Sequence, residues 1–264
     1  MRNTLLPIIA ALCLFIAGVS ILNIQLWYSA RAESLAGARY AANNINKILD
    51  EAAVATRTAI TIASKGCDPE EQYQLGTEAA LKPHLRTILI IRNGQVWCSS
   101  LPGNRALLAR IPDIPDSNLL LAPAIDTVNR LPILLYQTFS SSSRILVTIS
   151  DQHIRGALNV PLKGVSYALR VGDSIIGSSG DVSLIKDHKS FTSKVNSKEY
   201  QFSIIYNPPR LFSIPRIIDK GLGIFIFILL ISSATAYLIN KYMKKDSTPE
   251  ETLRRAIANG EIVP

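Results

Sequence analysis

Two long uncharged stretches constrain this chain more than any other feature of its sequence. Residues 5–27 hold 23 residues without a charge and, at about 1.5 Å per helical residue, span roughly 35 Å. Residues 221–240 hold 20 more, which span about 30 Å and lie between Lys220 and Lys241. Each stretch is long enough to cross a bilayer. Two crossings would place both termini on one side and residues 28–220 on the other.

Both stretches have an alternative interpretation. Ala30-Arg31-Ala32 fits the cleavage pattern of a signal peptide, but the apolar region of a signal peptide is usually about 7–15 residues, which favours an uncleaved span. The second stretch could be a buried core helix. Few core helices are apolar on every face for this length and end in Lys241, Lys244 and Lys245.

Composition excludes several classes of protein. The 264 residues are 48% hydrophobic and 18% charged, which excludes a disordered or collagen-like chain. The net charge is +8, but the basic residues do not gather into one stripe, so we expect no nucleic-acid partner. We expect Arg210, Arg216 and Lys220 to face lipid headgroups beside the second stretch. The lipid bilayer is therefore the first expected partner.

Cysteine usage bears on the compartment. Cys13 lies inside the first apolar stretch, which leaves Cys67 and Cys98 in the segment between the stretches. An even count suits an oxidising compartment and one disulfide, whereas two unpaired buried thiols are the alternative that spacing leaves open. A bridge would close a loop of about 32 residues and stabilise the domain by roughly 3–4 kcal/mol.

The residues after the first stretch predict a continuous helix. No proline occurs from Ile8 to Lys65, so the span is expected to continue out of the membrane as one helix that Gly66 ends. One face of it has three-four spacing. This face could contact a second copy in a parallel dimer or pack on a sheet, and we favour the sheet. Its residues are Leu35, Ala38, Ala42, Ile45, Leu49 and Ala52.

From residue 87 the pattern changes to strands. Residues 87–92 and 95–100 flank Asn93-Gly94, the strongest short signal for a hairpin with a type I′ turn, and this places Cys98 on a strand. Further strands are predicted at 133–139, 144–150, 165–171, 191–195 and 200–206. The fold class is α+β: two transmembrane helices flank a domain with a long N-terminal helix and a mostly antiparallel sheet. This arrangement is of the broad kind seen in PAS-like input domains.

The final residues, 241–264, read as the start of a further domain. Thr248-Pro249-Glu250-Glu251 is a capping box with proline at the first helical position, and Asn259-Gly260 ends the helix. Residues 261–264 resemble the beginning of a strand. A helix of about ten residues and half a strand cannot bury a core of their own, so we expect more chain to follow.

These features together carry a family resemblance. The chain resembles the N-terminal sensory half of bacterial CSS-motif cyclic-di-GMP phosphodiesterases, in which a periplasmic domain between two inner-membrane spans precedes a cytoplasmic EAL domain. The naming motif is Cys98-Ser99-Ser100, with Cys67 as the matching cysteine, and residues 249–264 look like the start of the EAL domain.

The resemblance implies a topology and a mechanism. Residues 1–4 and 241–264 would be cytoplasmic, 28–220 would be the periplasmic sensor domain, and the location would be the bacterial inner membrane. A disulfide between Cys67 and Cys98 would inhibit the enzyme, and reduction to the free thiols would relieve that inhibition. The periplasmic thiol-oxidising machinery is then a partner.

The catalytic signature of the family does not occur in this chain. Glu78-Ala79-Ala80-Leu81 has one alanine too many for Glu-Ala-Leu and lies in the segment assigned to the periplasm. Hydrolysis by an EAL domain needs two divalent ions held by clustered carboxylates. Those ligands and the catalytic lysine would lie beyond Pro264. We therefore expect a truncated homologue with no catalytic residues, no metal and no cofactor of its own.

Other candidate chemistries have ordinary structural interpretations. His84, His153 and His188 are scattered without the spacing of a metal site. Residues 177–180 lack the spacing of a nucleophile elbow and read as a turn. We expect Ser99 and Ser100 to end a strand and bond to the backbone.

Three functional hypotheses follow. The first is a redox-responsive periplasmic sensor that uses Cys67 and Cys98. The second is an interaction protein that forms homodimers or mixed dimers with full-length relatives, with the small-residue spacing of Ser232 and Ala236 as its sequence feature. The third is a working phosphodiesterase whose catalytic half is lost through a frameshift or an early stop.

Overall fold

The computed structural model describes most of the chain as two compact units. The described residues are 2–101, 117–124, 131–140, 143–162, 164–184, 192–245 and 257–258. The larger unit is Arg31–Pro209, and the smaller one joins Met1–Ala30 with Arg210–Pro264. The capping box predicted at residues 248–251 lies outside the described residues, and Ile257 and Ala258 are helical.

Four helices occur in the described part of the chain. Helix α1 (Arg2–Lys65) is continuous, as the absence of proline after Pro7 predicted, and α4 (Ile214–Lys245) extends beyond the predicted apolar stretch at both ends. Helices α2 (Pro69–Leu81) and α3 (Asp151–Leu158) were not predicted. Pro69, Glu70 and Glu71 in the first turn of α2 are residues that favour a helix N-terminus, so a start signal was present.

The first sheet of the larger unit is antiparallel and five-stranded, in the order β2-β1-β5-β4-β3. Asn93 and Gly94 have φ angles of 48° and 76°, which confirms the type I′ turn between its first two strands. Two of the predicted strands, 133–139 and 144–150, are present with their ends shifted by one residue. The strands are β1 (Leu85–Arg92), β2 (Gln95–Ser99), β3 (Leu119–Ala122), β4 (Ile133–Ser140) and β5 (Ser143–Ser150).

A second five-stranded antiparallel sheet follows α3, in the order β8-β7-β6-β10-β9. The prediction of one sheet was therefore wrong. Alternation along a strand shows which face is buried but not which strand is its partner, and the strands after α3 pair only with one another among the described residues. They are β6 (Tyr167–Val171), β7 (Ser174–Gly177), β8 (Val182–Leu184), β9 (Ser193–Asn196) and β10 (Ser203–Tyr206).

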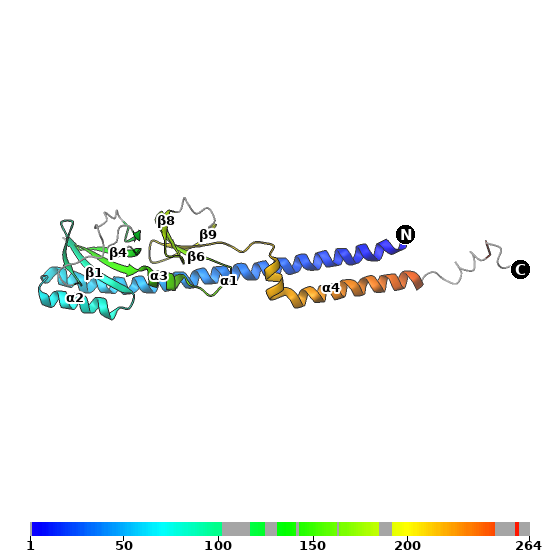
Figure 1. The fold of residues 1–264 in the computed structure, drawn as a ribbon, viewed down its shortest axis with the longest axis horizontal. Helices are drawn as coiled ribbons and strands as arrows, with labels where there is room; N and C mark the ends of the chain where they lie inside the picture. The colour runs from blue at the N-terminus through cyan, green and yellow to red at the C-terminus, as the bar shows by residue number, and fades with distance from the viewer. Residues whose placement is uncertain are drawn as a thin grey trace. The chain divides into compact units, whose positions relative to one another are not determined.

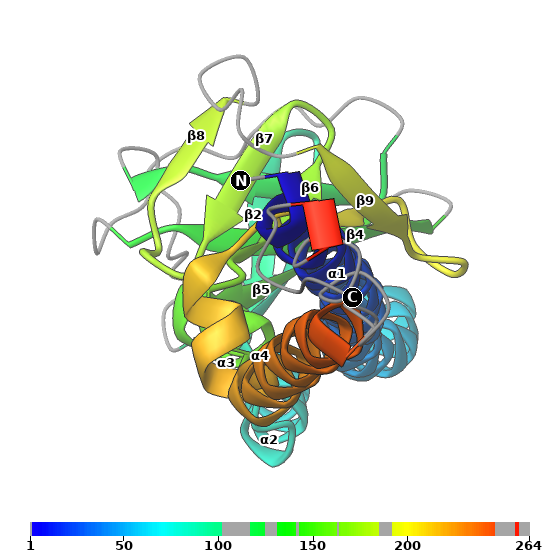
Figure 2. The same cartoon turned by 90° about the vertical axis from the view of Figure 1, so that its right-hand side faces the viewer.

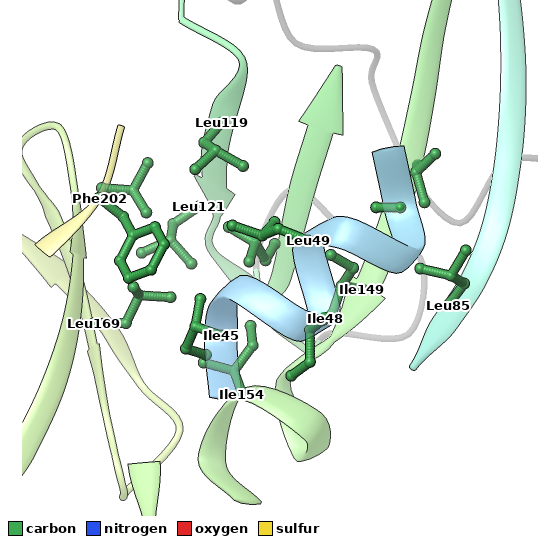
Figure 3. Close-up of a cluster of buried hydrophobic side chains, with 14 of the residues drawn as sticks. Ile45, Ile48, Leu49, Leu85, Leu119, Leu121, Ile149, Ile154, Leu169 and Phe202 are labelled. Atoms are coloured by element: carbon green, nitrogen blue, oxygen red, sulfur yellow. The ribbon is translucent and has the colours of Figure 1, made fainter. Parts of the chain in front are cut away.

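Both sheets lie along one side of α1 and share its buried face (Figures 1 and 2). Ile45 and Leu49 of α1 lie among side chains from both sheets, with Leu121 of β3 and Leu169 of β6 close by (Figure 3). The preference for sheet packing over a dimer seam is thereby confirmed. The buried residues on this face are Ala38, Ala41, Ala42, Ile45, Ile48, Leu49, Ala52, Ala55, Ala59, Ile62 and Ala63.

Polar side chains add to this contact from the second sheet. The Tyr200 hydroxyl donates to Asp50 Oδ1 at 2.6 Å, and Ser197 Oγ bonds to Asn46 Oδ1 at 2.9 Å. Burial and the bonded Asp50 carboxylate raise the pKa of Tyr200, so its hydroxyl stays protonated and remains a donor. The loop before β10 is thus held to α1 by hydrogen bonds as well as by the core.

The smaller unit is a pair of apolar helical segments in close contact. Both α1 and α4 contain stretches long and apolar enough to cross a membrane. The rings of Phe15 and Phe225 meet edge to face with centroids 5.8 Å apart. A Cβ on Gly18 would lie 2.8 Å from Ile228 Cγ2, so glycine allows this approach. Ser232, whose small side chain was considered for contacts with a second protein, is already buried by other residues of this chain.

Gly37 allows an equally close contact in the larger unit. The Tyr167 hydroxyl of β6 reaches over Gly37 and donates to the Ser34 carbonyl oxygen at 3.1 Å. A Cβ at position 37 would overlap that hydroxyl and lie 2.9 Å from Tyr167 Cζ. Any larger residue must therefore displace Tyr167 from α1.

We expect Gly37→Ala to destabilise the larger unit by about 1–3 kcal/mol, because the new methyl group forces Tyr167 out of its site and breaks its hydrogen bond. The measurement is the urea midpoint of the detergent-solubilised chain, followed by near-ultraviolet circular dichroism. Gly156→Ala on α3 is the matched control, because its Cβ would have no neighbour within 4 Å. Equal midpoints for the two variants would contradict the role assigned to Gly37.

Candidate functional site

Cys67 lies in the short connection between two helices. Helix α1 ends at Lys65, where the Gly66 N–H still donates to the Ile62 carbonyl oxygen at 3.2 Å, and α2 begins at Pro69. The predicted stop at Gly66 is confirmed, although Gly66 does not adopt a positive φ. With a three-residue connection, the position of Cys67 is set by both helices.

Cys98 lies on β2, at the edge of the first sheet. It pairs with Ile90 of β1, and its side chain is completely buried, whereas Cys67 is only half-buried. The type I′ turn at Asn93-Gly94 fixes the register of this hairpin and so the position of the cysteine.

The two cysteines form a disulfide. Their Cα atoms are 5.7 Å apart, an ordinary value for the bond, and 31 positions separate them in sequence. The bridge ties the end of α1 to the edge of the first sheet. Cys13, the third cysteine, is an exposed free thiol on the apolar part of α1.

The two serines after Cys98 fix the end of the strand. Ser99 Oγ accepts from the Leu101 N–H at 3.1 Å, and Ser100 Oγ accepts from the Ile88 N–H at 3.0 Å. The Ser100 N–H donates to the Ile88 carbonyl oxygen at 2.9 Å. Both hydroxyls therefore bond to the backbone, as the sequence predicted.

Arg92 makes a second connection between α1 and the hairpin, and sequence reasoning missed it. Its guanidinium lies over the Trp97 ring, 3.5 Å from the centroid, and donates through Nε to Ser143 Oγ at 3.0 Å. Nη2 donates to the carbonyl oxygen of Ala63 in the last turn of α1, where a cation is favourable. The hairpin register already placed Arg92 diagonal to Trp97, which was the available signal.

The structure also brings together two histidines that the sequence analysis described as scattered. His84 Nδ1 lies 2.9 Å from both carboxylate oxygens of Glu51 on α1, and the His84 and His153 rings meet edge to face with centroids 5.2 Å apart. The contact joins α1, the start of β1 and α3, which lie far apart in sequence. No cluster of three or more metal-ligating side chains occurs among the described residues, and His188 lies outside them.

The surroundings of His153 disfavour its protonation. Burial lowers its pKa from the ordinary value of 6.5, and the neighbouring His84 lowers it further, while Glu51 and Asp151 act in the opposite direction. The folded chain therefore takes up a proton at His153 less readily than the unfolded chain. Stability is then lost as the pH falls through and below the ordinary histidine range.

Residues 177–180 form a turn after β7, in which Gly180 has a φ of 88°. This agrees with the turn predicted there. A residue other than glycine would be strained at that position, and its Cβ would meet the Arg155 side chain at 3.1 Å.

We expect His153→Gln to reduce the loss of thermal stability between about pH 7.5 and about pH 5, because glutamine has no proton to gain. The measurement is the difference in unfolding temperature between the two pH values, compared with the unmodified chain. Lys194→Gln, which removes an exposed positive charge far from His153 in sequence, is the control. An unchanged pH dependence in the histidine variant would contradict the assignment.

Comparison with known proteins finds a matching family model and a similar protein. The family model described as "CSS motif domain associated with EAL" matches residues 30–219. The chain is 72% identical over 264 residues to the probable cyclic di-GMP phosphodiesterase PdeG of Escherichia coli (strain K12). That alignment covers 100% of this chain and 52% of the relative, so the chain spans about half the relative's length.

Among solved structures, the extracellular domain of rpHK1S-Z16, a protein classed as a histidine kinase, is similar, with a TM-score of 0.47 and 13% sequence identity. The match covers 74% of this chain and 96% of that one. The family match stands on the sequence and includes both cysteines of the disulfide. The chain therefore belongs to the CSS-motif domain family associated with EAL domains.

Proposed function

We propose that this chain is the membrane-anchored, redox-responsive sensory part of a cyclic di-GMP phosphodiesterase. Residues 28–220 would lie in the periplasm, with both termini in the cytoplasm. The observation that carries the proposal is the Cys67–Cys98 disulfide, which joins the end of α1 to the first sheet. We assign the hydrolysis of cyclic di-GMP, the activity named for the relative, and the divalent metal ions it needs to an EAL domain of the kind named in the family description.

The two apolar helices support the membrane anchor. Both pass the length and hydropathy requirements of a span, and their apolar side chains are largely exposed in the chain alone, as expected of residues that face lipid. A soluble core helix would bury such residues. A periplasmic location for the domain is also consistent with its disulfide, because that compartment is oxidising.

The position of the disulfide supports a role for its redox state. The bridge crosslinks the C-terminal end of α1, and the same continuous helix contains the first apolar stretch. Reduction by a dithiol would break the Sγ–Sγ bond, deliver two electrons and two protons to form two thiols, and oxidise the dithiol to a disulfide. Cys67 is half-buried whereas Cys98 is fully buried, so we assign the Cys67 sulfur as the atom attacked. The thiol-oxidising machinery of the periplasm would restore the bridge.

Arg92 determines how much freedom reduction gives to the helix. Its bonds to Ala63 and Ser143 and its stacking on Trp97 do not depend on the disulfide. The reduced domain would therefore keep its fold while the end of α1 becomes less constrained. This is the behaviour required of a switch.

The first test is the thiol state in cells. We expect Cys67 and Cys98 to resist alkylation in protein from oxidising cells and to react after reduction, while Cys13 serves as an internal control. Two free thiols in the oxidised sample would refute the redox proposal.

Loss of the bridge in Cys67→Ser/Cys98→Ser should lower the free energy of unfolding by about 2–4 kcal/mol, measured in urea.

The second test measures output. This chain, joined to the part of the 72% identical relative that it does not cover, should hydrolyse cyclic di-GMP in membranes. Removing both disulfide cysteines should raise the rate by roughly 5-fold or more, a coupling of about 1–3 kcal/mol between sensor and enzyme. Cys13→Ser is the control and should leave the rate unchanged. Equal rates with and without the bridge would contradict redox control, whereas an inactive chimera would contradict the assignment to a phosphodiesterase.

A further inference from the structure

A cavity in the larger unit has no part in the redox proposal. It has a volume of about 340 Å³, near the lower end of the range for small-molecule sites. It lies where β1 begins, β5 ends and α3 starts. Six of the residues that line it are Leu85, Arg86, Leu131, Gln152, His153 and Arg155.

The charges around this cavity leave one positive charge without a partner. The Asp151 carboxylate, which also lines it, is buried and accepts from Arg155 Nη2 at 3.0 Å and from Ser150 Oγ at 3.3 Å. Arg86 makes no ion pair with any of the described residues. Two guanidinium groups against one carboxylate give the lining a net charge of +1, which attracts an anion.

Two further features favour an anion. The Nε of Arg155 is buried and has no hydrogen-bond acceptor among the described residues. A buried donor without an acceptor is costly, and a bound oxygen atom would relieve that cost only if Arg155 turned its Nε toward the cavity. The cavity also includes the first turn of α3, whose backbone N–H groups and dipole favour negative charge.

The remaining walls indicate what kind of anion fits. Leu85 and Leu131 contribute apolar surface to the lining, whereas the guanidinium groups contribute positive charge. A short hydrocarbon chain can cover such surface, whereas phosphate and sulfate have no apolar surface with which to do so. Planar guanidinium groups match a carboxylate through paired hydrogen bonds.

We propose that this cavity binds a short-chain organic monocarboxylate. Arg86 and Arg155 hold the carboxylate, and Leu85 and Leu131 contact the hydrocarbon chain. Since α3 connects the two sheets in sequence, the ligand would contact the segment between them. The inference is independent of the disulfide and of the phosphodiesterase assignment.

The test is calorimetric titration of the detergent-solubilised full chain with butyrate at constant ionic strength. Butyramide has the same shape without the charge, and inorganic phosphate has the charge without the hydrocarbon chain. We expect butyrate alone to bind. Binding of butyramide as tight as that of butyrate, binding of phosphate as tight as that of butyrate, or no binding of butyrate at millimolar concentrations would each overturn the proposal.

A matched pair of variants locates the binding. Arg86→Gln should weaken butyrate binding about tenfold or more, because it removes a charge-assisted hydrogen bond to the carboxylate. Arg170→Gln removes an arginine of β6 that does not line the cavity and should leave affinity unchanged. Arg86 has no ion pair among the described residues, so its variant should keep the thermal stability of the parent chain, which can be measured in the same samples. Equal affinity in both variants would refute the site.

Discussion

The larger unit depends on the burial of one face of α1. This face is built mainly from alanine and isoleucine, and it lies against two separate sheets at once. Alanine keeps the helix surface narrow, so the strands can approach closely without leaving a void. Gly37 allows a still closer approach, since Tyr167 occupies the space where a side chain at position 37 would be. The sheets share no strand pairing among the described residues, so they are joined through one hydrophobic core to which α1 and α3 both contribute.

The disulfide acts on that same support. It lies at the end of α1 and at the edge of the first sheet, where a covalent bond adds to contacts that packing already makes. The guanidinium of Arg92 repeats the connection without a covalent bond. A bridge at the helix end can be broken while the alanine face remains packed, as the proposed redox role requires.

The candidate site was largely predictable because its signals are local. Asn93-Gly94 fixes the hairpin and so places Cys98 on a strand, while Gly66 ends the helix just before Cys67. That the two cysteines meet could not be read from their spacing, which also allowed two free thiols. The helix end and the hairpin edge come together only when α1 packs on the sheet. The Arg92–Ala63 bond and the His84–His153 contact were missed for the same reason.

The sequence by itself determined the long helix, the two apolar stretches, the hairpin and the family, because each depends on residues close together in the chain. It did not determine that the strands form two sheets, since alternation shows which side of a strand is buried but never its partner. The tertiary structure decided that pairing, and with it the contact of Glu51, His84 and His153 and the cavity beside α3. These features join residues distant in sequence, and only the packing of both sheets on α1 places them together.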